Sequence, residues 1–433
     1  MNIPIDIINK YRDLLSVAAI SGKTVYENEL TRISNLKVNR VQKITINYIF
    51  ITYWHHFLKH FNDSLRPAII KNVNALINCY KDLSKGHLFL ECSNCDNFHL
   101  LGLSCNSRFC TSCGQRYRSE RSLNIQSKLL DSPHRHFVFS IPFNLRPFFW
   151  HCRSLFDCLF KSVSDAFDIT LAKSKSAKRR DERVGFVAFL HTSGRSLNPH
   201  PHLHVLLAER TFDKLGKLKK IHYFHFKRLK TAFMYRFLEL ANKEIKALNN
   251  KTLYNKFNKE RSIALKKYKD GFYVHDPANK KSNHYIKSSK AAADYISRYA
   301  SHPPITESNI LSLNEITNEI TWTYTPHEDL DNPVVITEHV FKFIAKLIRH
   351  IPDNKTHVLR YYGFYANRTN RIKKLSKLFN YKNLKHQKSQ LKWRIMIKRT
   401  YKFDPILCNC GSLLKVNFNY SYFGKYDWRD FDA

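Results

Sequence analysis

Three features are scarce or missing in this 433-residue sequence: long apolar runs, a secretion signal and acidic side chains. No uncharged apolar run reaches the roughly 18 residues that indicate a membrane-spanning helix, so we expect no such helix. Met1 to Pro4 lead into charged sequence rather than into the apolar core of a signal peptide. The sequence therefore predicts a cytoplasmic protein with no membrane partner.

The shortage of acidic residues leaves a large positive charge. The chain has 72 Lys and Arg residues against 35 Asp and Glu, which gives a net charge of +37 at pH 7. A surplus of this size attracts polyanions, and nucleic acid is the polyanion that we expect first. The remaining composition, 43% hydrophobic and 14% aromatic, is that of a globular protein long enough for two or three domains. We therefore expect a protein that binds nucleic acid, in the cytoplasm and associated with the nucleoid.

Five of the ten cysteines lie within one short segment that ends at residue 113. Close clustering of cysteines in a large chain without a secretion signal indicates zinc rather than disulfides. Two Cys-x2-Cys pairs offer four thiolates at the spacing of a zinc ribbon or treble clef. We predict one structural Zn²⁺ ion, with Cys105 or His99 as the alternatives for one position; the four predicted ligands are Cys92, Cys95, Cys110 and Cys113.

The other cysteines give weaker signals. Cys79 stands alone in a helical segment and is expected to be a small buried residue rather than a ligand. Cys408-Asn-Cys410-Gly411 is shorter than an ordinary knuckle and supplies only two thiolates. We therefore do not expect a second zinc site from the sequence.

The segment from residue 198 to residue 207 alternates histidine with apolar residues. On a strand, the period of two puts His202 and His204 on one face and Leu203 on the other. Two neutral imidazoles on a rigid strand form half of a metal site; the alternative is a half-buried strand whose histidines face solvent. The preceding strand, predicted over 184–191, most simply pairs antiparallel with this one, so His191 would lie beside both histidines.

The alanine-rich stretch from residue 290 to residue 304 favours a helix that the two prolines end. Tyr295 and Tyr299 are four residues apart, so both hydroxyls would lie on one helical face. An aromatic pair packed on the core is the alternative. Further along, residues 371–402 hold twelve Lys or Arg and no acidic residue. Interleaved aromatics favour a nucleic-acid surface there over a solvated helix face.

These elements fit one reaction, the attack of a tyrosine on a DNA phosphodiester assisted by a metal ion. A divalent ion held by His202 and His204 would polarise the scissile phosphate and stabilise charge in the transition state. A tyrosine with its ordinary pKa near 10 is a poor nucleophile and needs that help. The phosphotyrosine bond keeps the energy of the cleaved linkage, so rejoining needs no ATP.

His-hydrophobic-His on a strand, followed by Tyr-x3-Tyr on a helix, resembles the signature of HUH endonucleases. Within that group the chain is most similar to the two-tyrosine rolling-circle insertion-sequence transposases that carry an N-terminal zinc-binding domain. The resemblance covers most of the chain from about residue 58. The segments that carry it are Leu65-Arg66-Pro67, the cysteine segment, and residues 136–139, 197–204, 295–304 and 360–364.

The resemblance implies roles for individual residues. His202 and His204 would bind Mg²⁺ or Mn²⁺, and Tyr295 and Tyr299 would be the nucleophiles that form 5′-phosphotyrosine intermediates. The substrate would be single-stranded DNA at the ends of the element, together with target DNA. A third metal ligand is usual in such sites; His191 is preferred and His200 is the alternative.

We therefore predict an α+β protein with an HUH-endonuclease palm, which is an antiparallel sheet with packed helices. The predicted segments are a helical N-terminal region (1–90), a zinc-binding module (91–132), an HUH nuclease/transposase domain (133–350) and a basic C-terminal region (351–433). The alternatives are an HUH replication initiator, a relaxase-like nickase, or a zinc-containing DNA-binding protein without catalysis. The recognised DNA sequence, the order of the two tyrosines and the oligomeric state do not follow from the sequence.

Overall fold

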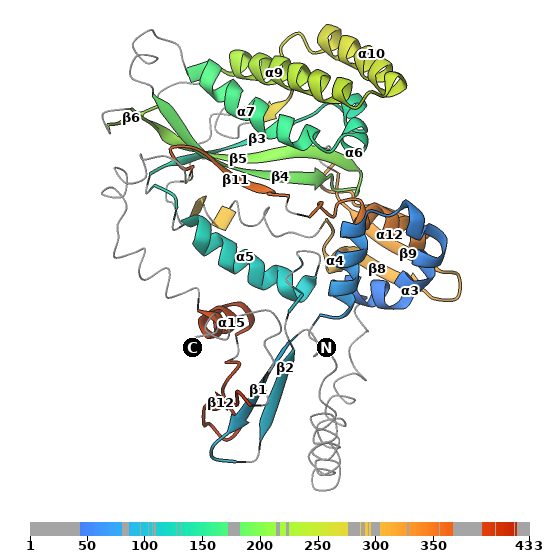
Figure 1. Cartoon of the computed structure of the whole chain (residues 1–433), viewed down its shortest axis with the longest axis vertical. Coiled ribbons are helices and arrows are strands. Elements are labelled where there is room, and N and C mark those ends of the chain that lie inside the picture. The colour runs from blue at the N-terminus through green and yellow to red at the C-terminus, as the bar shows by residue number, and fades with distance from the viewer. Residues whose placement is uncertain are drawn as a thin grey trace.

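A computed structural model of the chain shows a central sheet with helices above and below it and two smaller units beside it (Figure 1). The residues that the structure describes are 44–79, 86–95, 97–102, 104–105, 107, 110–126, 128–130, 132–171, 182–213, 217–221, 225–275, 286, 291–292, 294–295, 304–326, 329–354, 356–366, 392–402, 404–419 and 421. None of the helices within these ranges is long and apolar enough to span a membrane.

The central sheet has the strand order β11-β4-β5-β3-β7, and β6 pairs with β5 beside this path. All of its pairings are antiparallel. The mixture of this sheet with helices confirms the predicted α+β class. The strands are β3 (His134–Ser140), β4 (Arg183–Ser193), β5 (Pro199–Phe212), β6 (Leu218–Lys220), β7 (Val274–His275) and β11 (Leu359–Gly363).

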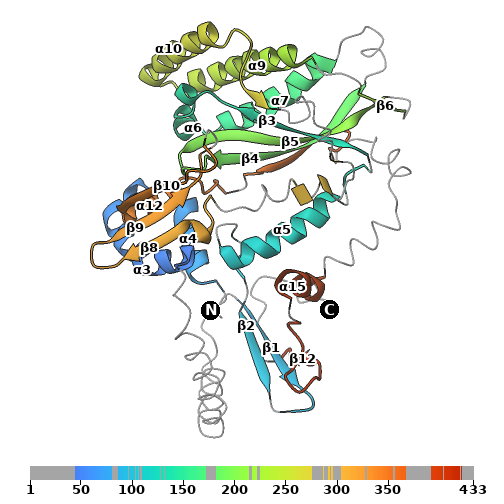
Figure 2. The same ribbon diagram turned by 180° about the vertical axis from the view of Figure 1, so that it is seen from behind.

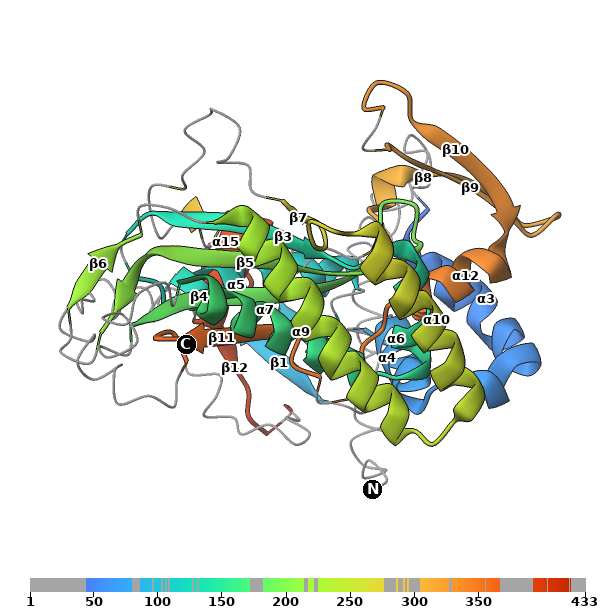
Figure 3. The ribbon, with the colours of Figure 1, turned by 90° about the horizontal axis from the view of Figure 1, so that it is seen from above.

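One face of the central sheet is covered by α7 and α9, and α10 lies outside them (Figures 1 and 3). Alternate residues of β3 and β5, such as Phe139, Leu203 and Val205, point into this layer and are fully buried. Burial of their apolar surface is the main force that holds the layer to the sheet. The elements of this side are η3 (Phe143–Leu145), α6 (Phe148–His151), α7 (Leu155–Leu171), α9 (Phe226–Ala247) and α10 (Lys251–Lys267).

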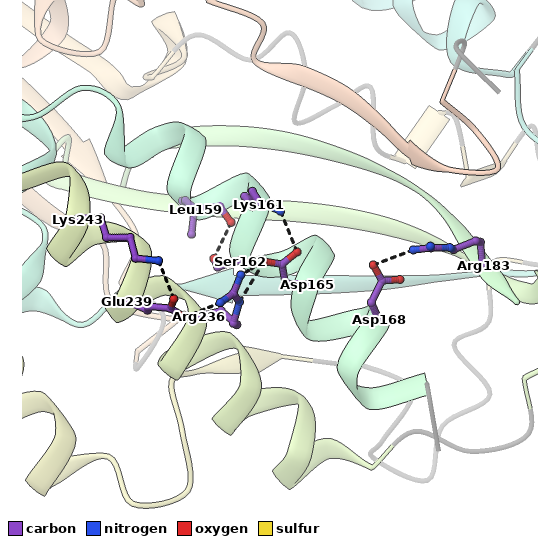
Figure 4. Close-up of polar contacts among 9 residues, drawn as sticks. All are labelled: Leu159, Lys161, Ser162, Asp165, Asp168, Arg183, Arg236, Glu239 and Lys243. Carbon is purple, nitrogen blue, oxygen red and sulfur yellow. Dashed lines mark hydrogen bonds and ion pairs between the residues drawn. The ribbon is translucent and has the colours of Figure 1, made fainter. Parts of the chain in front are cut away.

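A polar network ties α7 to α9 at the outer side of this layer (Figure 4). Arg236 of α9 donates to Asp165 of α7 from both Nε (3.0 Å) and Nη2 (2.7 Å). Lys161 also donates to Asp165, at 3.1 Å. The helix α10 was not predicted, because its sequence is strongly polar and only Phe257 and Ala264 are buried.

The opposite face of the sheet packs against α5 (Thr111–Gln126), which runs below the strands in Figure 1. At one end of this face Leu206 and Ala208 of β5 contact a small apolar cluster that includes Ile125, Phe364 and Tyr365. Because side chains alternate along a strand, the same face of β5 carries His202 and His204 at its other end. This face is therefore apolar at one end and histidine-rich at the other.

A second unit combines segments from distant parts of the sequence beside the central sheet (Figures 1 and 2). Its core includes Trp54 and Phe57 from the N-terminal helices together with Trp322 and Phe343. Arg66 and Arg153 both pair with Asp353, which joins this unit to the central layer. Its elements are α3 (Ile46–Phe61), η1 (Asn62–Ser64), α4 (Pro67–Ile77), η5 (Glu307–Asn309), β8 (Ile310–Asn314), β9 (Glu319–Tyr324), β10 (Val334–His339) and α12 (Val340–Ile348).

A third unit is a small sheet of order β12-β1-β2 that projects away from the central sheet (Figure 1). It consists of β1 (His87–Cys92), β2 (Phe98–Gly102) and β12 (Leu414–Val416), and α15 (Trp393–Tyr401) precedes β12 in the sequence. Packing thus crosses the predicted segment boundaries, because residues 46–79 share a core with residues 305–351 and β12 pairs with β1.

Candidate functional site

The candidate site lies on the central strands of the large sheet. In the pairing of β4 with β5, His191 lies opposite His202, and in the pairing of β3 with β5, Ser140 lies opposite His202. Opposite residues in an antiparallel pair project to the same face. The predicted pairing of the two strands is therefore confirmed, and it brings His191 to the histidines of β5.

The side chains of His191, His202 and His204 form a compact group. Each offers a ring nitrogen, and these nitrogens all lie within 4.8 Å of one another. The Nε2 atoms of His202 and His204 are 3.2 Å apart. His200, the alternative third ligand, lies outside this group and shares a 2.7 Å hydrogen bond between its Nε2 and Ser140 Oγ.

Hydrogen bonds orient two of these rings. His202 Nδ1 donates to the backbone carbonyl of His200 at 2.7 Å, which leaves the Nε2 lone pair of His202 directed at the group. His204 Nδ1 shares a 3.0 Å hydrogen bond with His136 Nε2. Both residues of β5 therefore present Nε2 to the same point, as ligands of one ion do.

Burial keeps the imidazoles neutral. It lowers the pKa of His202 to about 4 and holds the pKa of His204 well below the ordinary value, with repulsion from neighbouring histidines adding to the effect at His204. Burial likewise lowers the pKa of His136 to about 4. Neutral imidazoles have free lone pairs at neutral pH, so the donor set fits a divalent cation without any competing proton.

Tyr295 lies next to this group. Its hydroxyl is 3.3 Å from His136 Nδ1, and its ring meets the His136 ring edge-on, with centroids 4.9 Å apart. Its neighbour Asp294 accepts a hydrogen bond from Ser122 of α5, which ties this segment to the helix below the sheet. Tyr299 lies outside the described residues.

A cavity of about 1160 Å³ opens in front of the histidines and Tyr295. Its lining also includes side chains for which the sequence analysis assigned no role: His136, Arg146, Tyr268, Tyr273, His275 and His350. The position of His136 was foreseeable from the pairing of β3 with β5, whereas Arg146 comes from a loop that no pattern connects to the site. The cavity therefore combines metal-ligating, hydroxyl-bearing and cationic groups.

The structure corrects the predicted zinc site, because the four predicted cysteines do not form one group. Cys110 and Cys113 lie at the start of α5 with Cys79 and Cys105, and all four sulfur atoms are within 4.8 Å of one another. The Sγ atoms of Cys79 and Cys113 are 3.5 Å apart. We call these four residues the N-terminal cysteine cluster. Cys79 is buried, as expected for a small apolar residue, and its sulfur also lies within this group, which was not expected.

The other predicted pair, Cys92 and Cys95, joins Cys408 and Cys410 in a second group of four, which we call the composite cysteine cluster. The reason is local geometry, because the β1–β2 hairpin carries Cys92 and Cys95 to its tip, away from α5. His99 of β2 pairs with Leu90 of β1 and belongs to neither group. A sequence shows which cysteines form pairs, but the choice of partner for each pair depends on the fold.

The N-terminal cysteine cluster fits a zinc ion. Four sulfur atoms bound to one zinc ion at about 2.3 Å lie roughly 3.8 Å apart. The separations of 3.5 Å between Cys105 and Cys113 and 3.7 Å between Cys110 and Cys79 are close to this value. The chemistry of the donor set, four cysteines of which three are buried, is that of a closed structural site.

Two family models match the chain. The "Transposase zinc-binding domain" model covers residues 49–141, which include the N-terminal cysteine cluster. The "Putative transposase" model covers residues 185–373, which include the histidines and both predicted tyrosines. No solved structure matches the chain.

Two curated relatives support the same assignment. The transposase for insertion sequence element IS801 of Pseudomonas savastanoi pv. phaseolicola is 28% identical over 323 residues, which are 73% of this chain and 74% of the relative. The "Putative transposase y4qJ" of Sinorhizobium fredii (strain NBRC 101917 / NGR234) is 23% identical over 321 residues, 70% of this chain and 76% of the relative. A transposase model, a zinc-binding-domain model and two transposase relatives thus agree, and over about 70% of its length the chain is similar to transposases of the IS91 and IS801 type that carry an N-terminal zinc-binding domain.

Proposed function

We propose that this protein cleaves and rejoins single-stranded DNA at the ends of an insertion sequence during rolling-circle transposition, through a 5′-phosphotyrosine intermediate. The observation that carries the proposal is the continuous contact from Tyr295 through His136 to His204 at the edge of the cavity. A nucleophile beside a group of metal ligands is the arrangement that phosphodiester cleavage requires.

In this proposal His191, His202 and His204 hold the divalent ion. When bound, that ion would neutralise charge on the scissile phosphate and position it. Nitrogen donors are poorer ligands for Mg²⁺, which prefers oxygen, than for transition ions. Of the two ions predicted from the sequence, Mn²⁺ is therefore the better match.

The tautomers follow from the hydrogen bonds. If Nε2 of His204 holds the ion, its proton is on Nδ1 and is donated to His136 Nε2. A neutral His136 then carries its own proton on Nδ1, the atom 3.3 Å from the Tyr295 hydroxyl oxygen. That proton stabilises negative charge on the tyrosine oxygen, which lowers the barrier to attack.

Cleavage exchanges a phosphodiester bond of the DNA for a phosphotyrosine bond. The Tyr295 oxygen forms a bond to phosphorus, the bond from phosphorus to the 3′ oxygen breaks, and the phenolic proton leaves to solvent while the 3′ oxygen gains one. Attack of a 3′ hydroxyl on the phosphotyrosine reverses the step and joins DNA. Tyr299, four residues further along the sequence, would hold a second strand in the same way.

The cavity contains a positive charge that suits a DNA phosphate. Arg146 lines the cavity and keeps its position through a 2.9 Å hydrogen bond from Nε to the carbonyl of Ile141. A guanidinium in the cavity would contact a backbone phosphate near the reacting one. We propose that the protein acts at the nucleoid, on single-stranded DNA at the element ends and on target DNA.

The test uses single-stranded oligonucleotides from the element's ends with Mn²⁺ and a denaturing gel. A covalent protein–DNA adduct is expected, with loss of the adduct when Tyr295 and Tyr299 are both changed to Phe. His202→Ala should reduce adduct formation at least about 100-fold, because a ligand and its hydrogen bonds are lost. Tyr235→Phe is the matched control, since Tyr235 is an exposed tyrosine on α9.

An adduct that persists in the double tyrosine variant would contradict the assignment of nucleophiles. Cleavage of element ends, rather than of a replication origin or a transfer origin, separates a transposase from an initiator or a relaxase-like nickase. A protein that binds the oligonucleotides without forming any adduct would point to the non-catalytic alternative.

A further inference from the structure

The composite cysteine cluster joins the β1–β2 hairpin to the C-terminal part of the described chain. Cys92 Sγ and Cys410 Sγ are 3.5 Å apart, and so are Cys95 Sγ and Cys408 Sγ, although more than 300 residues separate each pair in the sequence. Cys408 and Cys410 lie beyond the residues 49–141 and 185–373 that the two family models match. We propose that these four cysteines bind a second structural zinc ion, which fastens the C-terminal region to the β1–β2 hairpin.

The distances select a single ion. All four sulfur atoms lie within 4.8 Å of one another, and the two 3.5 Å separations are close to the roughly 3.8 Å edge of a tetrahedral zinc–thiolate site. An iron–sulfur cluster would hold its cysteines further apart, because several iron and sulfide atoms stand between them. Oxygen-preferring cations such as Mg²⁺ and Ca²⁺ do not suit four thiolates.

The backbone around the cysteines is arranged as in a zinc knuckle. The N–H of Asn94 donates to Cys92 Sγ at 3.4 Å. The side-chain amide of Asn97 donates to Cys408 Sγ at 3.8 Å. Donors aimed at sulfur favour the thiolate, which is the form that binds metal.

Gly411 allows the short Cys408-x-Cys410 spacing. Its φ of +86° is a left-handed conformation that side chains rarely adopt, and an added Cβ would meet no atom within 4 Å. Steric room is therefore not what requires glycine here, but backbone conformation is. The turn brings Cys408 Sγ next to Cys95 Sγ and Cys410 Sγ next to Cys92 Sγ. A Cys-x-Cys spacing, although shorter than that of an ordinary knuckle, therefore still contributes two of the four ligands.

The surrounding apolar core is too small to hold this arrangement alone. Its fully buried residues are Leu90, Cys408 and Leu414, and β12 pairs with β1 over three residues only. Small cores of this kind usually need a metal or a disulfide for stability. The metal ion would supply that stability, and it would fix α15, which precedes Cys408, next to α5.

The experiment measures metal content of the purified full-length chain by plasma mass spectrometry. Cys408→Ser with Cys410→Ser should remove one equivalent of zinc relative to the wild type. Cys152→Ala with Cys158→Ala is the matched control, because these buried cysteines belong to neither cluster, and it should leave the content unchanged. An unchanged zinc content in the Cys408/Cys410 variant would overturn the proposal.

A second variant separates loss of a ligand from loss of the fold. Cys410→His keeps a metal ligand at an exposed position. After exchange of zinc for Co²⁺, this variant should keep its metal but show a weaker sulfur-to-cobalt charge-transfer band, by about one thiolate in eight. A band identical to that of the wild type would mean that Cys410 does not bind the metal. Neither readout depends on DNA cleavage, so the result stands apart from the proposed function.

Discussion

His191, His202 and His204 lie on central strands of a sheet with a large apolar core. The composite cysteine cluster lies on a small core, whose buried residues are Leu90, Cys408 and Leu414. The histidines are oriented by hydrogen bonds to a carbonyl and to His136 before any ion binds. The cysteines instead connect segments that little else holds together. A metal ion would thus bind to histidines that are already oriented, whereas at the composite cysteine cluster it would hold the two segments together.

The two kinds of site also differ in access. The histidines face a cavity, so an ion held by them would keep a coordination position that a substrate could reach. The N-terminal cysteine cluster offers four sulfur atoms to one ion and is largely buried. Open sites suit catalysis and closed sites suit structure.

Metal removal should give the largest difference between these regions. A strong chelator is expected to unfold the cysteine-bearing hairpin while the central sheet stays folded, because only the former depends on metal for its stability. Hydrogen exchange followed by mass spectrometry would show loss of protection over residues 87–102 and retained protection over 134–140 and 199–212. Equal loss of protection in both regions would contradict the expectation that the hairpin depends on metal and the central sheet does not.

Acidification should weaken the histidine region through His136. Its pKa is about 4 in the folded protein, and the unfolded chain has the ordinary value near 6.5, so the unfolded state binds more protons between these values. Stability is therefore lost as the pH falls, by about 2 kcal/mol between pH 7 and pH 5 for this one group. In metal-free protein, urea unfolding of the central sheet should show a smaller loss for His136→Gln than for the wild type.

The control for this experiment is His151→Gln, because His151 is exposed at the end of α6. That variant should lose stability with falling pH as the wild type does. If His136→Gln shows the same pH dependence as the wild type, burial does not hold His136 neutral.

The polar network between α7 and α9 should have the smallest effect. Arg236→Met removes both hydrogen bonds to Asp165 but keeps the apolar stem of the side chain. The pair is partly exposed, so the free energy of unfolding should fall by no more than about 1 kcal/mol. Thermal unfolding would measure this, with Lys243→Met as the control, since the Lys243 side chain is more exposed. A loss of several kcal/mol would show that polar contacts, and not the apolar core alone, hold this layer.

Strong periodic patterns in the sequence predicted much of the central fold. The strands β4 and β5 lie where the apolar run of residues 184–191 and the alternation of residues 198–207 placed them. The polar helix α10 escaped prediction because its buried side is narrow. The domain boundaries followed the order of the chain, whereas packing joins the N-terminal helices to residues 305–351.

The sequence by itself determined the chemistry available to this protein: paired thiolates, alternating histidines on a strand, a tyrosine pair and a high positive charge. These follow from residue type and short spacing, which need no knowledge of distant contacts. Only the tertiary structure decided which groups meet. It brought His136 to His204, and it divided eight cysteines between two sites by pairing the first strand of the described chain with the last. Contacts between residues hundreds of positions apart depend on how strands and helices pack, and local sequence carries no record of that.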